Sequence, residues 1–421
     1  MQVVDASAVD FSTLIRAGER VVVGQATSEP LTLTRKLMRE VPAGGCSVFL
    51  GPVYSDTFAT APAGVSFESY GAIGQAARLA KAGRLDVLPL HYSAIDRALG
   101  DGTQRADCVM VQLSRDPAGK GYNLGLANDH VARAAHRARL VIAEINDDVP
   151  VCHGGEWPDD IPIHVCVRAE TPPLEVPPPS FSNIDLAIGA KAAALIPDRA
   201  VLQFGVGTQP QAVIAQLKGH RDLALHSGAL MDGVVDMVER GVITNAFKER
   251  DRGISAGGVL IGSRKLYDFV DGNAFFRLTP PAETHALPVL AGLLRFCAIN
   301  SAVEVDLTGQ INSEVAEGRY VGAVGGQVNF IRGANASEGG RAIIVLPATA
   351  RGGTVSRIVP QVSTVTCSRS DADAIVTEWG VAELRGCGLD ERAKRMIAIA
   401  APQFREELEH RWREMQGAAH G

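Results

Sequence analysis

Short runs of β-branched residues alternate with helix-like patterns along the whole chain. "RVVVG" is followed by "PLTLTRKLMREV", and "AVLQFGVG" is followed by "PQAVIAQL". Further strand-like runs read "ARLVIAEIN", "RAIIVLPA" and "DAIVTEWG". Strands that alternate with helices predict parallel sheets covered by helices. We therefore expect an α/β protein with mainly parallel sheets.

Two parts of the chain resemble each other at a constant offset. "VVVGQATSEPLTLTRKL" (21–37) aligns with "VLQFGVGTQPQAVIAQL" (201–217), so that Pro30 matches Pro210. Further along, "VFLGPVYSD" corresponds to "ALHSGALMD". Each unit reads as a strand, a turn of small residues and a helix that begins near a proline. The pattern indicates a duplicated α/β half, although generic strand–helix units would give a similar match.

A proline-rich stretch separates these two parts. "ETPPLEVPPPSF" (170–181) contains five prolines and no periodicity, which is typical of a stiff linker. We therefore expect two similar open α/β halves, residues 1–180 and 181–421. Ligands bind beyond the carboxyl ends of strands in open α/β sheets, so the cleft between the halves is the expected site.

Composition excludes several classes of protein. The net charge of -6 over 421 residues argues against binding to nucleic acid. No apolar run is long enough to span a membrane and the N-terminus lacks a signal pattern, so we expect a cytoplasmic protein. The seven cysteines are scattered without a C-x-x-C motif, which predicts reduced thiols and no metal site.

Glycine-rich turns follow several of the strand-like runs. One contains Gly205, Val206 and Gly207, and the segment 321–334 contains four glycines, Gln327 and Arg332. A third, "ARGGTVSR", contains Arg351, Gly352, Gly353 and Arg357. Glycine loops near arginines suit a phosphate-bearing ligand or an oxyanion held by backbone amides. They are also compatible with simple connectors.

Three glutamates lie near such turns, and familiar motifs are absent. Glu29, Glu314 and Glu378 could each be a base, a nucleophile or a helix-dipole partner. The chain has no P-loop, no G-x-S-x-G and no H-E-x-x-H. Pro210 also breaks the G-x-G-x-x-G pattern, which disfavours dinucleotide binding.

The stretch "LHSGALMDGVVD" (225–236) is typical of a strand, a turn and a helix that present a catalytic group. His226, Ser227 and Asp232 stand around the turn, and Gly228 is predicted at its most exposed point. Glycine offers no side chain, so the predicted turn lacks a reacting group.

Several stretches together resemble the acetyl-CoA hydrolase/transferase family of class I CoA-transferases. They are "LQFGVGTQPQAV", "DGVVDMVERGVITN", "AINSAVEVDLTGQINSE", "GGQVNFIRGA", "ARGGTVSRIVP" and "VTEWGVAELRG". The resemblance implies a duplicated α/β fold with coenzyme A bound as a substrate between the halves, and no cofactor. Its chemistry implies an acyl-CoA and a small carboxylic acid as ligands, and a homodimer or larger homo-oligomer.

In that family a glutamate attacks the thioester and later carries CoA, and the glycine turns supply amides to the oxyanion. The resemblance places this glutamate at residue 228, which is glycine here. The expected catalytic set is Gly228, Glu29, Glu378, Val206 and Gly325. The expected CoA and substrate contacts are Gly205, Gly207, Gly326, Gln327, Arg332, Arg351, Gly352, Gly353, Tyr54 and Met231, with Val53 and Ala229 also near the acyl group.

Three explanations of the missing glutamate remain open. The acceptor acid could attack acyl-CoA directly. In a related alternative, Glu29, Glu314 or Glu378 replaces the missing glutamate as the nucleophile, or acts as a base for water and gives hydrolysis. A paralogous partner chain could supply the glutamate, or the chain could be an inactive CoA-binding relative. The Gly228→Glu variant is expected to gain the glutamate-dependent route.

Overall fold

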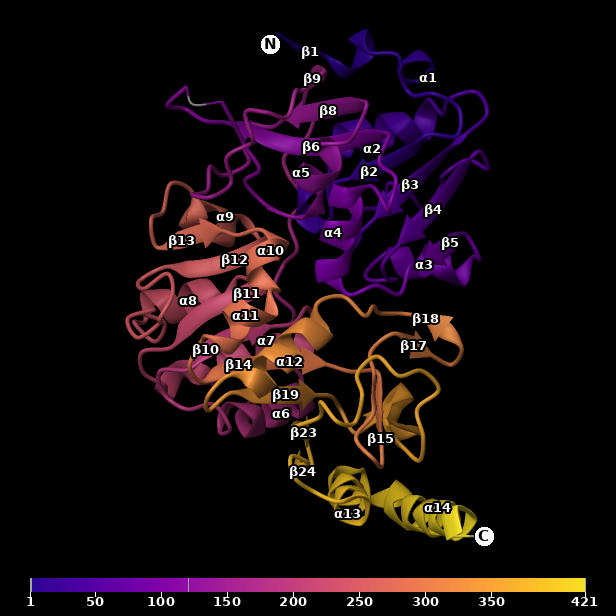
Figure 1. Ribbon diagram of the computed structural model, residues 1–421, viewed down its shortest axis with the longest axis vertical. Coiled ribbons are helices and arrows are strands. Elements are labelled where there is room, and N and C mark those ends of the chain that lie inside the picture. Colours follow the sequence, from indigo (N-terminus) through magenta and orange to yellow (C-terminus); the bar gives the residue numbers. More distant parts are fainter. Residues whose placement is uncertain (1, 120, 421) are drawn as a thin grey trace.

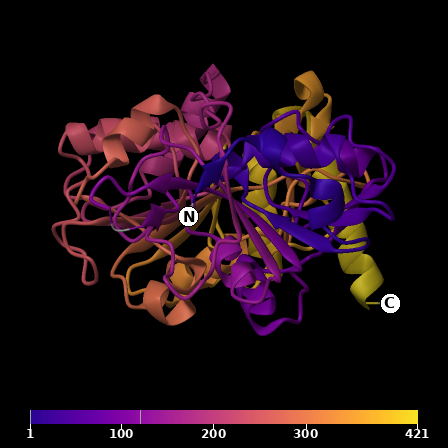
Figure 2. The same cartoon turned by 90° about the horizontal axis from the view of Figure 1, so that it is seen from above.

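The computed structural model describes residues 2–119 and 121–420, without the side chains of residues 418–420. It contains two large sheets, one in each half of the chain, and the first half is stacked on the second (Figure 1). The N-terminus and the C-terminus lie at opposite ends of the long axis. Seen from above, the yellow C-terminal helices emerge on one side of the molecule (Figure 2).

The first sheet is built from the strands of residues 3–168. Its order is β1 (Val3–Val4), β9 (Val165–Arg168), β8 (Leu140–Ile145), β6 (Cys108–Arg115), β2 (Arg20–Val23), β3 (Cys46–Leu50), β4 (Val65–Ser69) and β5 (Leu85–Val87), with β7 (Tyr122–Asn123) antiparallel to β6. Its helices are α1 (Phe11–Leu14), α2 (Leu31–Arg39), α3 (Ala76–Lys81), α4 (Tyr92–Asp101) and α5 (His130–Ala135).

The second sheet is built from residues 201–383. Its order is β13 (Phe276–Leu278), β12 (Ser255–Leu260), β11 (Ala224–Leu230), β10 (Val201–Phe204), β14 (Phe296–Ser301), β19 (Arg341–Val345), β23 (Ala374–Thr377) and the antiparallel β24 (Gly380–Glu383). Its helices are α6 (Asn183–Ala193), α7 (Thr208–Ala215), α8 (Gly233–Glu239), α9 (Arg264–Val270), α10 (Pro281–Thr284), α11 (Leu287–Ala291), α12 (Gln327–Ala336), α13 (Leu389–Ile399) and α14 (Pro402–His420).

Short ribbons complete the second half beside the large sheet. They are β15 (Glu304–Asp306) with β16 (Ile311–Asn312) and β22 (Ile358–Val359), β17 (Val315–Ala316) with β18 (Arg319–Tyr320), and β20 (Thr349–Ala350) with β21 (Val355–Ser356). Single turns of 3-10 helix cover Ala6–Ala8, Ala26–Ser28, Leu217–Gly219 and Arg351–Gly353.

The two large sheets share one topology, as the internal repeat predicts. The first runs β9-β8-β6-β2-β3-β4-β5 and the second runs β23-β19-β14-β10-β11-β12-β13. Numbered within its own half, each sheet has the same order of parallel strands. The central strands, such as β2, β6 and β8, are almost entirely buried and mostly apolar, because helices cover both faces of a parallel sheet. The expected α/β fold is confirmed.

The proline-rich stretch forms no helix or strand between residues 169 and 182. It ends at Ser182, which begins α6 with a reciprocal capping box: its hydroxyl accepts from the backbone N–H of Asp185, and that carboxylate accepts from the backbone N–H of Ser182. The stretch packs along the second half, where the N–H of Val176 donates to the carbonyl of Gly262 at 2.8 Å. The boundary at residues 180 and 181 stays a prediction.

Candidate active site

A cavity of about 440 Å³ lies between the two halves. Backbone hydrogen bonds join the two halves beside it: the N–H of Ala72 donates to the carbonyl of Gly322 at 2.8 Å, and the N–H of Tyr92 donates to the carbonyl of Gly325 at 2.9 Å. A volume of this size is typical of a small-molecule site. The structure therefore has a ligand-sized space at the place where a duplicated α/β fold predicts one.

Two glycine turns from the second half form one wall of the cavity. Gly205 and Val206 connect β10 to α7, and Gly325 and Gly326 precede α12. Gly325 has a φ of +49°, a left-handed conformation that favours glycine. Because both turns lead directly into helices, the positive ends of two helix dipoles lie beside the cavity. This wall favours a ligand group that carries or develops negative charge.

Gly228 lines the same cavity, but it does not lie in a turn. It is inside β11, which runs to Leu230 and pairs with β12 up to Leu260. The prediction of an exposed turn at Gly228 is wrong, because pairing with β12 extends the strand and the turn begins only at Met231. His226 and Ser227 are buried in the same strand and do not line the cavity.

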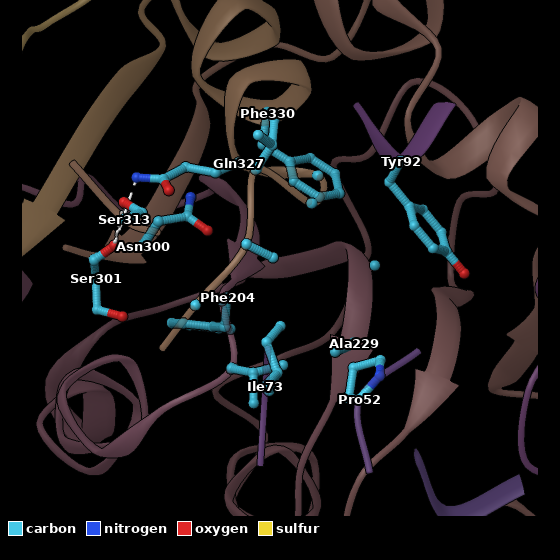
Figure 3. A pocket seen from close by; sticks show the side chains of 18 of the residues that line it. Pro52, Ile73, Tyr92, Phe204, Ala229, Asn300, Ser301, Ser313, Gln327 and Phe330 are labelled. Atoms are coloured by element: carbon cyan, nitrogen blue, oxygen red, sulfur yellow. Dashed lines mark hydrogen bonds between the residues drawn. The ribbon is translucent and has the colours of Figure 1, made fainter. Parts of the chain in front are cut away.

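Polar side chains gather at one end of the cavity, opposite Tyr92 (Figure 3). Asn300 and Gln203 exchange two hydrogen bonds through their side-chain amides, at 2.9 and 3.2 Å. The Gln327 amide donates to the carbonyl of Ser301 at 3.4 Å. These amides are held in place by each other and by the backbone, so this end of the cavity is preorganised.

The first half contributes a linked group of aromatic residues. The Gln25 side chain donates to the hydroxyl of Tyr92 and accepts from the hydroxyl of Tyr70, each at 2.5 Å. The sequence motifs did not identify these residues as candidates, although Gln25 lies in the duplicated turn that leads into α2. Only the fold brings them opposite the glycine turns of the second half.

His285, which sequence reasoning missed, packs directly against Gly228. A Cβ atom on residue 228 would lie 3.0 Å from Cε1 of the His285 ring, 3.1 Å from its Nε2 and 3.2 Å from Cζ of Phe330. The imidazole stacks at a tilt between Tyr92 and Phe330, with ring centroids 4.8 and 4.5 Å away. Burial and, to a smaller extent, nearby His226 lower the pKa of His285 to about 3, so the ring is neutral at neutral pH.

Among the described residues that line the cavity, Arg357 is the one with a charged side chain at neutral pH. Burial lowers the pKa of its guanidinium, and the nearby carboxylate of Glu378 acts in the opposite direction. Its side chain forms no hydrogen bond or ion pair with another residue in the described part of the chain. A partly buried guanidinium whose N–H groups are not hydrogen-bonded by the protein is suited to bind an anionic ligand group.

The three candidate glutamates lie outside the cavity lining. Glu29 is fully buried, where it accepts from Thr34 at 2.8 Å and from Ser55 at 2.7 Å, and burial raises its pKa. Glu314 accepts from the Thr366 hydroxyl at 2.7 Å, and Glu378 accepts from the N–H of Ala348 at 2.8 Å. Within the described residues, the cavity lining contains no Asp or Glu side chain.

Several other candidates also lie away from the lining. Gly207 is the N-cap of α7, Met231 is buried, and burial raises the pKa of Tyr54 to about 12. Arg332 forms an ion pair with Asp371, and Arg351 forms one with Glu317. Gly352 and Gly353 follow Arg351 in the same turn of 3-10 helix. Val53 is buried. The candidates that do meet at the cavity are Gly205, Val206, Gly228, Ala229, Gly325, Gly326, Gln327 and Arg357.

Family models match both parts of the chain. Residues 5–168 match the acetyl-CoA hydrolase/transferase N-terminal domain, and residues 262–412 match the acetyl-CoA hydrolase/transferase C-terminal domain. The chain belongs to the acetyl-CoA hydrolase/transferase family, as its sequence motifs predict.

Individual relatives support the same assignment. The chain is 41% identical to the 4-hydroxybutyrate coenzyme A transferase of Clostridium kluyveri over 77% of each chain. It is 28% identical to the butyryl-CoA:acetate CoA-transferase of Anaerostipes caccae over 94% of this chain and 92% of the relative. The solved structure of RipA from Yersinia pestis superposes with a TM-score of 0.91 at 31% identity, covering 99% of this chain and 98% of that one.

None of the helices in residues 2–119 and 121–420 combines the length and apolarity that a membrane span needs. The same residues contain no cluster of three or more His, Cys, Asp or Glu side chains placed to hold a metal ion.

Proposed function

We propose that this chain moves CoA from an acyl-CoA thioester to a carboxylic acid without an enzyme-bound glutamyl-CoA intermediate. One observation carries the proposal: residue 228 is glycine, and no carboxylate lines the cavity in the described part of the chain. Glycine can form neither an anhydride nor a thioester. The carboxylate that reacts must therefore belong to the acceptor acid.

The cavity retains the features that acyl transfer needs. Addition of a nucleophile to the thioester carbonyl places negative charge on oxygen. The positive ends of α7 and α12 lie at the turns of Val206 and Gly326, beside the cavity. Fixed backbone dipoles at such a site typically contribute about 3 kcal/mol to the transition state for each N–H donor. These turns support a reaction at the thioester carbonyl, with CoA as a substrate and no further cofactor.

Arg357 supports the second substrate. Its guanidinium forms no hydrogen bond or ion pair within the described residues, and it lines the cavity that contains Gly228. We assign it to an anionic group of the substrates, the acceptor carboxylate in the first instance. When both substrates are bound together, proximity favours attack of the acceptor carboxylate on the acyl carbon.

The acyl group lies against apolar side chains in this proposal. Ile73, Ala229, Val259, Ile261 and Phe330 all line the cavity. Such walls accept short apolar acyl chains and discriminate weakly by single methylene groups. We therefore expect several short acyl-CoAs to serve as donors.

The test is to incubate the purified chain with butyryl-CoA, with and without acetate, and to follow acetyl-CoA and free CoA. Acetate-dependent formation of acetyl-CoA supports transfer. Free CoA released equally without acetate would show a hydrolase instead. Absence of both products, with CoA still bound, would show a CoA-binding relative or the partner of a glutamate-bearing chain. We expect the chain to act alone, as a homo-oligomer.

A further inference from the structure

The space that a side chain at residue 228 would enter is occupied by the imidazole of His285. Its Nε2 and Cε1 atoms lie 3.1 and 3.0 Å from the position of a Cβ atom there, closer than the ordinary contact range of 3.4–4 Å. On the opposite side, a Cβ on Gly326 would lie only 2.4 Å from the same Nε2. Glycines on β11 and before α12 therefore leave room for this ring between them.

Hydrogen bonds around Thr284 fix which ring nitrogen of His285 carries the proton. The Thr284 hydroxyl donates to the carbonyl of Pro280 at 3.2 Å, and it lies 2.8 Å from Nδ1 of His285. With the one hydroxyl proton assigned to the bond with the Pro280 carbonyl, Nδ1 is assigned as the donor of the second bond. Nε2 then carries the free lone pair, and it is the nitrogen beside Gly228 and Gly326.

Every other potential nucleophile of the described lining must lose a proton before it attacks, because it is a hydroxyl of Tyr70, Tyr92, Ser301 or Ser313. Within the described residues, the lining contains no Asp, Glu, Cys or Lys. The hydroxyls of Tyr70 and Tyr92 are engaged with Gln25, and burial raises the pKa of both well above the usual value. A neutral imidazole is the one lining group that is nucleophilic without prior loss of a proton.

We propose that His285 takes the chemical place of the carboxylate missing at residue 228, with Nε2 as the nucleophile toward the thioester. This inference rests on the proposed function. The Nε2 lone pair adds to the carbonyl carbon, the C–S bond breaks, and CoA leaves as the thiolate. The product is an acyl-imidazolium whose Nδ1–H remains hydrogen-bonded to Thr284.

Two further steps complete a balanced transfer. An oxygen of the acceptor carboxylate attacks the acyl carbon, the bond to Nε2 breaks, and a mixed anhydride forms while neutral His285 is restored. The thiolate then attacks the acceptor carbonyl of the anhydride. The donor acid leaves as its carboxylate, and the new thioester carries the acceptor acyl group.

Burial of His285 suits this role in two ways. The ring stays neutral, so its lone pair is available throughout the neutral range. Tight packing against Tyr92 and Phe330 holds Nε2 beside the glycine turns and limits rotation of the ring.

The experiment is rapid acid quenching of the protein with butyryl-CoA in the absence of an acceptor acid, followed by peptide mass spectrometry. We expect a butyryl group on the peptide that contains His285. His285→Gln is expected to lose the adduct and at least about 100-fold of transfer activity, as loss of a covalent catalyst does. An adduct on Asp or Glu, or transfer by His285→Gln within twofold of the parent chain, would overturn the proposal.

His130→Gln is the matched control. His130 is also buried and contacts an aromatic ring edge-on, but it does not line the cavity. The His130→Gln variant shows how much the loss of a buried imidazole lowers the melting temperature. We expect this variant to keep the butyryl adduct on His285 and the transfer rate of the parent chain.

His285→Ala provides a second variant that tests chemistry and not packing. It leaves a ring-sized gap open to the cavity, so added imidazole is expected to restore transfer, whereas pyrazole, of similar shape and much lower basicity, is not. Equal rescue by both would overturn the nucleophilic role. Absence of transfer in the parent chain would instead refute the proposed function itself, so the two failures are distinguishable.

Discussion

Gly228→Glu tests whether the cavity has adapted to the absence of a side chain at this position. From sequence alone, this variant is expected to gain a glutamate-dependent route. The structure changes that expectation, because the new Cβ would lie 3.0–3.2 Å from His285 and Phe330. Each ring would have to move by a few tenths of an ångström against its stacked neighbours, so overpacking is expected to destabilise the fold by about 1–3 kcal/mol. The single variant is therefore expected to lose stability and to gain no new route.

The double variant Gly228→Glu/His285→Ala supplies the missing room. Removing the imidazole opens the volume that the glutamate needs, so the two substitutions should couple favourably by about 1–2 kcal/mol in a double-mutant cycle. Urea unfolding of the parent, both single variants and the double variant measures this coupling. We expect only the double variant to form a glutamyl-CoA thioester, which borohydride reduction and mass spectrometry detect.

One result would refute this reasoning. If Gly228→Glu alone is as stable as the parent chain and shows the thioester, the His285 ring does not block the position. If the two substitutions are strictly additive in stability, the ring and the residue at position 228 do not share the same space.

Further predictions concern charge in and around the cavity. Arg357→Gln is expected to lower kcat/KM for the acceptor acid by about 10- to 100-fold. Arg357→Lys is expected to lower it by less, since lysine keeps the positive charge but lacks the paired N–H donors of the guanidinium. An unchanged kcat/KM would show that Arg357 does not bind the acceptor acid. Glu29→Gln and Glu378→Gln are expected to keep transfer within about threefold, since neither lines the cavity; a loss above about 100-fold in a folded variant would contradict this. Burial raises the pKa of Glu144 to about 7, so its proton is held more tightly in the folded state and stability falls as pH rises from about 4.5 to about 7. Glu144→Gln is therefore expected to raise the melting temperature at about pH 8 and not at about pH 4, and an equal shift at both would contradict the assignment.

Local patterns in the sequence predict the fold well. Alternating strands and helices, and the constant offset between residues 21–37 and 201–217, predict two equivalent parallel sheets, which the structure contains. These signals succeed because burial on both faces of a sheet leaves continuous apolar runs that are visible one strand at a time. The glycine turns at Gly205 and Gly325 are likewise visible, because they connect a strand to a helix or introduce a helix directly.

The sequence predicts only part of the site, because much of it is assembled by distant segments. Gly228 and His285 are far apart in the chain, and only the packing of α10 against β11 brings them together. Nothing in "PPAETHALP" distinguishes His285 from an ordinary buried histidine. Conversely, Glu29 and Glu378 follow strands, as catalytic carboxylates often do, yet neither lines the cavity. Glu29 is buried and accepts a hydrogen bond from Ser55, and Glu378 accepts one from the backbone N–H of Ala348.

The origin of the oxygen in the released acid tests the central claim most directly. A single turnover with butyryl-CoA and acetate labelled with heavy oxygen separates the routes, because the attacking oxygen ends in the departing donor acid. We expect butyrate from the first turnover to carry one labelled oxygen, since the acceptor carboxylate attacks the acyl carbon itself. Unlabelled butyrate in that turnover would show that an enzyme carboxylate or water supplied the oxygen, and it would contradict transfer without a glutamyl intermediate.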